Sequence, residues 1–406
     1  MFTGSQRFSL SPVSRTWIRM ISVFFLLFVL SIGFSHGQPN PTTGRMQISI
    51  AGEEALSPQV FPSGESVCVV WSQFEDDFYR LFSRYWNGSQ WSSPATIEAG
   101  YGDALYPLGT RSGGALLVAW TENQGSGFGR IHMMRSMDQG QSWQPSEALS
   151  DWHTGAGGAA LAASGNRVCL AWTDSSSGLM ALRYKTSLDQ GTVWTAEKSL
   201  AVSSQDCRHP TMCVSGNQVY VAWEDWRHGQ PEIYYQRSLD NGGTWSSATA
   251  MSVVDSFASE RPAIACSGQV ICLVWQEDTL TNPALMIIRS TNGGSSWTRR
   301  KLAEAEGSLV SPVIAADGNQ MVLGFIEGNG PAARLEILKS SDSGQTWSSF
   351  DSYSADPAAW LGLPSLGAAG GIIYAAWCQH HSQGFSSLIS RNPPFAPPAY
   401  PLLLIY

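Results

Sequence analysis

A turn motif of nearly constant spelling, Ser-x-Asp-x-Gly-x-x-Trp, recurs at regular intervals along the chain, and we call each copy a motif turn. Its tryptophans Trp143, Trp194 and Trp245 stand 51 residues apart. A fixed interval of this length is typical of repeat proteins, in which each unit buries its apolar side chains against its neighbours. Intact copies occupy residues 136–143, 187–194, 238–245 and 340–347, and degraded copies occupy residues 87–91 and 290–297.

An apolar run that ends in an aromatic residue provides a second periodic mark. It defines seven units, and within each unit short β-rich runs are separated by Gly, Asn, Asp and Ser in a pattern of four strands. Repeated four-stranded units of this length are typical of β-propeller blades. We therefore predict an all-β fold, a seven-bladed propeller. The aromatic residues are Trp71, Trp120, Trp172, Trp223, Trp275, Phe325 and Trp377.

The last unit lacks a fourth strand before a proline-rich segment. We expect Met46–Ile50 to supply that outer strand, because it occupies the place that residues 95–97 occupy in the next repeat. This closure would remove an exposed sheet edge. The predicted propeller spans residues 46–391 after a linker at 38–45, and the tail at 392–406 either docks on the ring or contacts a partner.

The first 37 residues have the features of an export signal. Arg15 and Arg19 precede the apolar run Met20–Ile32, and the small residues Ser35 and Gly37 suit a cleavage site. We predict a signal peptide at residues 1–37 and a secreted, periplasmic or cell-surface protein. A retained membrane anchor is the alternative.

The charge balance excludes some partners. Removing the three leader arginines moves the formal net charge from −8 to −11, which disfavours nucleic acid and anionic membrane surfaces. We expect no cofactor and no metal, because His380 and His381 point to opposite sides of a strand and no cysteine or carboxylate motif completes a site. Structural calcium is not indicated, and we expect a monomer.

Seven cysteines in an exported chain raise the question of disulfides. Cys266 and Cys272 share a predicted hairpin but are out of register, so most cysteines are expected to be small buried hydrophobic residues. Bridges between Cys207 and Cys213, or between Cys378 and a neighbour, remain open. The odd count leaves at least one free thiol.

The motif turns resemble the Asp-boxes of the sialidase-like propeller superfamily, also called BNR repeats. The resemblance covers nearly the whole mature chain and implies that the turns are folding devices on the face opposite the ligand site. Because the superfamily includes sialidases, modules of xyloglucan-degrading enzymes, photosystem assembly factors and receptor propellers, it does not assign a reaction. The residues given this structural role are Asp138, Asp189, Asp240, Asn292 and Asp342.

Ligand binding is expected on the other face, in loops that enter each first strand or join second and third strands. Trp152, Trp226 and Trp360 fall outside the periodic tryptophans and are assigned to these loops, where they could stack on a sugar or fill gaps between blades. The same loops gather the polar residues Asp151, His153, Arg208, His209, Asp225, Arg227, His228, Glu260, Arg261, His380 and His381.

Arg208, Arg227 and Arg261 could converge on a carboxylate, as the three arginines of sialidases do, because a guanidinium offers paired donors to two oxygens. An acid recurs two residues after the strand aromatic in several units, and Asp225 is one copy. A repeated acid is usually structural. We therefore favour an Asp225–Arg227 pair within the blade.

A sialidase-like hydrolysis needs a tyrosine nucleophile, a glutamate beside it and an acid for the leaving group. The catalytic candidates are Tyr106, Glu260 and Asp103, and the Arg-x-Pro of the family appears at residues 208–210, in the fourth unit. Seven units also depart from the six blades of typical sialidases. We predict a propeller that binds carbohydrate or an extracellular partner, with a glycoside hydrolase as the alternative and a non-catalytic protein scaffold as the third.

Overall fold

The computed structural model describes residues 45–51, 53–98, 100, 102–124, 129–152, 157–175, 178–201, 203–305, 307–355, 359–381 and 384–392. The predicted signal peptide and the tail beyond Asn392 lie outside the described residues. So does His153.

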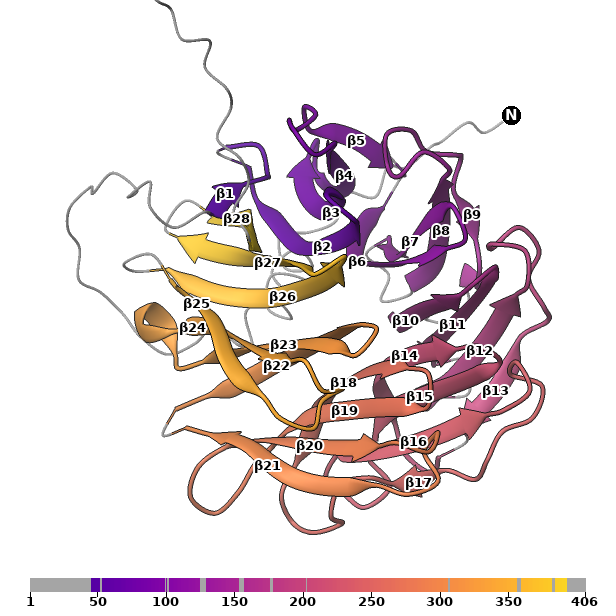
Figure 1. Cartoon of the computed structure of the whole chain (residues 1–406). Coiled ribbons are helices and arrows are strands. Elements are labelled where there is room, and N and C mark those ends of the chain that lie inside the picture. The colour runs from indigo at the N-terminus through magenta and orange to yellow at the C-terminus, as the bar shows by residue number, and fades with distance from the viewer. Residues whose placement is uncertain are drawn as a thin grey trace, which may run out of the picture. The chain divides into compact units, whose positions relative to one another are not determined.

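The chain forms seven four-stranded antiparallel sheets arranged around a ring (Figure 1), as the sequence predicts. Six blades are consecutive in sequence. Blade 1 is β2 (Ala55–Ser63), β3 (Ser66–Glu75), β4 (Phe78–Trp86) and β5 (Ala95–Glu98), and blade 2 is β6 (Asp103–Ser112), β7 (Ala115–Asn123), β8 (Gly129–Ser136) and β9 (Glu147–Ala148). Blade 3 is β10 (Gly157–Ser164), β11 (Arg167–Asp174), β12 (Ala181–Ser187) and β13 (Lys198–Ala201), and blade 4 is β14 (Cys207–Ser215), β15 (Gln218–Asp225), β16 (Glu232–Ser238) and β17 (Thr249–Ala250). Blade 5 is β18 (Ser259–Ser267), β19 (Val270–Glu277), β20 (Ala284–Ser290) and β21 (Thr298–Glu304), and blade 6 is β22 (Leu309–Asp317), β23 (Gln320–Glu327), β24 (Arg334–Ser340) and β25 (Ser348–Ser354), with a short 3-10 helix, η2 (Gly330–Ala332).

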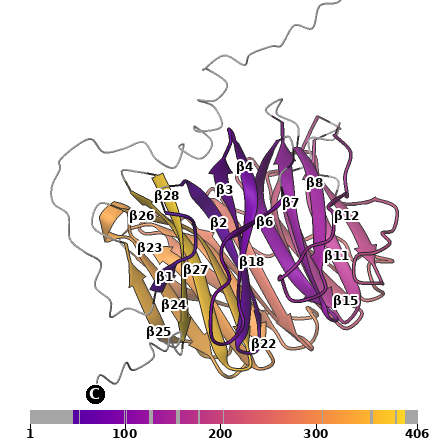
Figure 2. The ribbon, with the colours of Figure 1, turned by 90° about the horizontal axis from the view of Figure 1, so that it is seen from above.

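Blade 7 combines strands from both ends of the described chain. Its first three strands are β26 (Trp360–Ala369), β27 (Ile372–His381) and β28 (Gly384–Asn392), and β1 (Arg45–Gln47) completes it beside β28. The amide of Ile48 donates to the Ser387 carbonyl at 2.9 Å, and the Ile48 side chain is fully buried. The predicted closure is confirmed, and Figure 2 shows blade 1 beside blade 7.

The core lies between blades, because each sheet packs both faces against its neighbours. The central residues of the second strands are therefore apolar, as in the run Val219–Trp223 of β15, where every residue is fully buried. The periodic aromatic residues sit in these strands, and the indole N–H of Trp223 donates to Asp225 at 3.2 Å. Gln73 and Glu277 accept from Trp71 and Trp275 in the same way. The residue two positions after the tryptophan thus satisfies a buried donor in these three blades.

Each motif turn connects the third and fourth strands of a blade. In blade 4 the Ser238 hydroxyl accepts from the Gly242 amide at 2.8 Å and donates to Asp240 at 2.8 Å, and Asp240 accepts from the Thr244 amide at 2.8 Å. Asn292 holds the equivalent turn of blade 5 by accepting from the Ser296 amide at 2.9 Å. These side chains replace the missing backbone partners of a tight turn.

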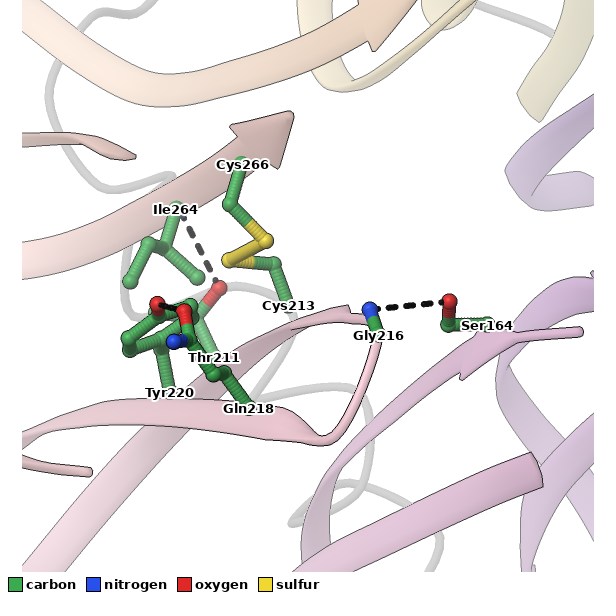
Figure 3. The surroundings of a disulfide bond; sticks show 8 residues. All are labelled: Ser164, Thr211, Cys213, Gly216, Gln218, Tyr220, Ile264 and Cys266. Carbon is green, nitrogen blue, oxygen red and sulfur yellow. Dashed lines mark hydrogen bonds between the residues drawn. A yellow bond between two sulfur atoms is a disulfide. The ribbon is translucent and has the colours of Figure 1, made fainter. Parts of the chain in front are cut away.

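A disulfide joins Cys213 of β14 to Cys266 of β18, with a Cα–Cα distance of 5.9 Å. Figure 3 shows it beside a second inter-blade contact, in which the Ile264 amide donates to the Thr211 hydroxyl at 3.3 Å. The Cys207–Cys213 bridge that the sequence left open does not form, because the partner of Cys213 lies on the adjacent blade. Cys207 and Cys378 are buried free thiols, as are Cys68, Cys169 and Cys272.

The first strand of each blade is innermost, since the first strands of adjacent blades contact one another. Each carries a β-bulge near its start, and one residue of the bulge has a positive φ. The seven residues are Ser57 (φ 51°), Tyr106 (φ 53°), Gly158 (φ 27°), His209 (φ 46°), Arg261 (φ 54°), Ser311 (φ 56°) and Leu363 (φ 48°). All of them except Gly158 precede a proline.

Candidate functional site

The bulges lie at the ends of the inner strands that face the expected ligand loops, and we call this side the loop face. First strands begin and second strands end here, as the pairing of Cys207 with Asp225 shows. The bulge recurs in every blade and is therefore part of the architecture. The side chains at the bulges therefore determine the chemistry of the loop face. The large polar residues at these positions are Tyr106, His209 and Arg261.

Two acids lie beside these residues, on blades 4 and 5. Together the five residues Tyr106, His209, Glu224, Glu260 and Arg261 form what we call the mouth cluster. Glu224 is 1% exposed, and its Oε1 accepts the backbone N–H of Arg261 at 2.8 Å. This contact crosses from blade 4 to blade 5, so a buried carboxylate fixes the backbone of the Arg261 bulge.

His209 lies against the same carboxylate oxygen. Its Nδ1 is 2.8 Å from Glu224 Oε1, a close polar contact that does not have the geometry of a hydrogen bond. The imidazole is 41% exposed whereas Glu224 is 2% exposed by side chain.

Glu260 precedes Arg261 and lies opposite Gln276, whose amide donates to Glu260 Oε2 at 3.2 Å. Burial raises the pKa of Glu260, and the neighbouring Glu224 carboxylate raises it further. This carboxyl is therefore less readily ionised than an ordinary glutamate.

Tyr106 belongs to blade 2, and Arg261 belongs to blade 5. Burial raises the pKa of the Tyr106 phenol, while the Arg261 guanidinium lowers it. Both residues occupy bulges of inner strands, Tyr106 in β6 and Arg261 in β18. The Tyr106 side chain remains accessible, with 50% of the residue exposed.

The other two arginines of the predicted carboxylate site are held by acids of their own loops. Arg227 makes a bidentate pair with Asp225, with distances of 2.8 Å from Nε and 2.6 Å from Nη2 to the carboxylate oxygens. This is the pairing within the blade that the sequence favours over a ligand role. Arg208 donates to Asp206 at 2.7 Å. Two of the three guanidinium groups therefore have a counter-ion within their own blade.

The aperiodic tryptophans occupy different settings. Trp226 lies in the loop between β15 and β16, half-buried, with the Arg208 guanidinium 5.4 Å from its ring centroid. The Trp152 ring lies under Arg130 at 5.4 Å and against the edge of His132. Trp360 is the first residue of β26 rather than a loop residue, because it pairs with His380.

Two further candidates are engaged by their own surroundings. Asp103 Oδ1 accepts the Tyr79 amide at 2.9 Å, and burial raises the pKa of Asp103. His228 Nε2 lies 2.9 Å from the Tyr234 hydroxyl. These contacts tie both side chains to the blade walls.

Sequence reasoning missed Glu224. It directly follows the strand tryptophan, at a position that holds Ser72, Thr121 and Thr173 in the first three blades. A charge that breaks a repeat at a buried position signals a specific role. That signal was hidden by the repeated acid at the next residue, Asp225.

Within the part of the chain that the structure describes, no three His, Cys, Asp or Glu side chains gather in a way that could hold a metal ion. The same described residues include no helix that is long and apolar enough to cross a bilayer.

The sequence matches no protein-family model and no curated protein. Several solved structures share the fold. A protein of unknown function from Dyadobacter fermentans superimposes with a TM-score of 0.53 at 13% identity, covering 86% of this chain and 99% of that one. An ulvan lyase bound to -[GlcA(1-4)Rha3S]- superimposes with a TM-score of 0.59 at 12% identity, covering 82% of this chain and 93% of the lyase.

A mutant of Trypanosoma rangeli sialidase displaying trans-sialidase activity gives a TM-score of 0.52 at 13% identity, with 86% of this chain and 59% of the sialidase covered. The chain thus matches less than two thirds of that sialidase. At such identities these likenesses establish a β-propeller fold and nothing about the reaction.

Proposed function

We propose that this protein is a secreted or cell-surface propeller of the sialidase-like, BNR-repeat type that binds a carboxylate-bearing carbohydrate at its mouth cluster. The observation that carries the proposal is the contact between blades 4 and 5 at the loop face, where the buried Glu224 carboxylate accepts the Arg261 amide at 2.8 Å and lies 2.8 Å from His209 Nδ1. A guanidinium pairs with a carboxylate, and an accessible phenol offers a ring face and a hydroxyl to a sugar.

The electrostatics of the cluster are compatible with an acidic ligand. Glu224 is buried against His209 and the Arg261 amide, and the pKa of Glu260 is raised by burial and by Glu224. The raised pKa of Glu260 reduces the negative charge that an incoming carboxylate meets. Trp226 lies on the adjacent loop, and its backbone amide donates to the Asp206 carbonyl at 3.0 Å.

Two other observations support the proposal. The polysaccharide lyase and the sialidase that share the fold act on carbohydrates, according to their descriptions. The disulfide between blades suits an oxidising compartment, which agrees with the predicted export signal.

A glycan array that pairs carboxylated glycans with their neutral counterparts tests this function. We expect retention of the carboxylated members, and we expect Arg261→Gln to weaken binding by about 10- to 100-fold, the size of a lost charge-assisted hydrogen bond. Arg334→Gln is the matched control, because Arg334 is an exposed arginine of blade 6 near Glu327 and Glu336. Equal retention of neutral and acidic glycans by the wild type would refute the proposal.

A further inference from the structure

We propose a second binding site, for an oxyanion, between blade 5 and the motif turn of blade 6. Arg289 of β20 and Arg300 of β21 hold a sulfate or carboxylate group there by charge-assisted hydrogen bonds. The motif turns lie where the third strands end, whereas the loop face lies where those strands begin. The site is therefore separate from the mouth cluster and does not depend on the function proposed above.

A cavity of about 110 Å³ lies at this junction. A single water needs only about 10–15 Å³, so the cavity has room for an oxyanion. The residues that line it include no acid. They are Ile287, Arg289, Thr298, Arg299, Arg300, Gly344 and Gln345.

The strand register places both arginines on one face of blade 5. Ile287 pairs with Arg300, and Arg289 pairs with Thr298, so the two arginines are diagonal neighbours across the outer two strands. Arg299 points to the other face, since it donates to the Met251 carbonyl of blade 4. The side chains that present charge to the cavity are therefore Arg289 and Arg300.

Both guanidinium groups are anchored on the motif turn of blade 6. Arg289 Nε donates to the Ser343 carbonyl at 2.7 Å, and Arg300 Nη2 donates to the Gly344 carbonyl at 3.4 Å. Each contact uses one nitrogen of a group that carries five N–H donors, so donors remain for a ligand. Neither guanidinium makes an ion pair with an acid among the described residues. The nearby Asp342 carboxylate already accepts hydrogen bonds within its own turn.

The other blades show that two cations exceed what this junction needs. Blades 2 and 6 hold opposite charges at the two equivalent positions, and blades 3 and 4 hold one cation. The pairs are Arg135 with Glu147, Lys339 with Asp351, Thr186 with Lys198, and Arg237 with Thr249.

A single cation suffices to contact the next motif turn. Lys198 of blade 3 does so by donating to the Gly242 carbonyl at 3.2 Å. Among these five blades, blade 5 alone places two like charges on one face. Their repulsion is relieved when an anion lies between them, so the exception to the repeat indicates a ligand.

Isothermal titration calorimetry with sodium sulfate tests the site on the full chain, with sodium chloride holding the ionic strength constant so that screening does not change. We expect the wild type to bind sulfate. Arg300→Gln should weaken binding by about 10- to 100-fold, the size of a lost charge-assisted hydrogen bond. Arg300→Glu should abolish binding, because it gives blade 5 the opposite charges that blade 2 has.

Lys198→Gln is the matched control. Lys198 pairs with Tyr184 as Arg300 pairs with Ile287, and it also contacts the next motif turn, but it lies beside no second cation. This variant should bind sulfate as the wild type does. Thermal denaturation without ligand shows whether each variant is folded.

A further titration identifies the source of the anion. Dextran sulfate and polygalacturonate are compared with neutral dextran and with free sulfate. Tighter binding of an acidic glycan supports a site for a polysaccharide, and equal binding of free sulfate supports a site for the ion. A wild type that binds neither, or equal binding by the wild type and Arg300→Glu, would overturn the proposal.

Discussion

At the scale of single residues, the opening is built from backbone positions that are costly for most side chains. A non-glycine residue with positive φ costs on the order of 1–2 kcal/mol, and a following proline restricts it further. Six such residues surround the opening as part of a repeated bulge. The architecture therefore meets this cost in six of the seven blades, and the identity of the side chain at those bulges is available for function.

Glu260 allows a prediction of pH dependence. Its pKa is raised in the folded protein, so the folded state binds its proton more tightly than the unfolded state does. The associated stability is present below the ordinary carboxyl pKa and is lost as the pH rises through the folded pKa. We expect Glu260→Gln to raise Tm at neutral pH and to give no such gain in acid, where the wild-type carboxyl is protonated in both states. Thermal denaturation at several pH values measures this, and a lower Tm at neutral pH would contradict it.

At the scale of elements, the motif turns explain why one blade docks on the next. The turn glycine of blade 4, Gly242, has φ +80° and lies directly against the Tyr184 hydroxyl of blade 3. A Cβ atom added at Gly191 would lie 2.6 Å from the Leu117 side chain of the preceding blade, and one added at Gly344 would lie 2.5 Å from the Cys272 sulfur of its preceding blade. The glycine is thus required both by backbone conformation and by the close approach of the neighbouring blade.

Substituting Gly242 tests this double requirement. Gly242→Ala should destabilise the fold by about 2–4 kcal/mol, because it adds a clash with Tyr184 to the strain of a positive φ. Gly216→Ala is the matched control. Gly216 also has a positive φ, +59°, but nothing lies within 4 Å of an added Cβ, so we expect a loss of about 1 kcal/mol. Chemical denaturation compares the two, and equal losses would show that blade contact contributes nothing.

At the scale of the whole molecule, two devices hold the ring together across blade boundaries. β1 completes blade 7 through contacts that include Ser49, whose hydroxyl accepts the Ser387 amide at 3.2 Å. The Cys213–Cys266 disulfide joins inner strands of blades 4 and 5 over a sequence separation of 53 residues. The first device closes the ring, and the second stabilises the side of the ring that carries most of the mouth cluster.

The contribution of the disulfide can be measured directly. The double variant Cys213→Ser with Cys266→Ser should lose about 4 kcal/mol in the free energy of unfolding, because an open loop of this length gains entropy when the chain unfolds. Chemical denaturation with and without a reductant provides the measurement. The reductant should destabilise the wild type and leave the double variant unchanged; a wild type indifferent to reductant would refute the assignment.

The sequence by itself determined the seven blades, the strand that closes the ring and the pairing of Asp225 with Arg227, because each follows from a period or from contacts within one repeat. The tertiary structure alone decided which cysteines pair, that Trp360 lies in a strand, and that Glu224 contacts both His209 and the Arg261 amide. The disulfide and the contact between Glu224 and Arg261 join different blades. A repeat specifies what lies within a unit, whereas contacts between units depend on how closely the packed sheets approach around the ring.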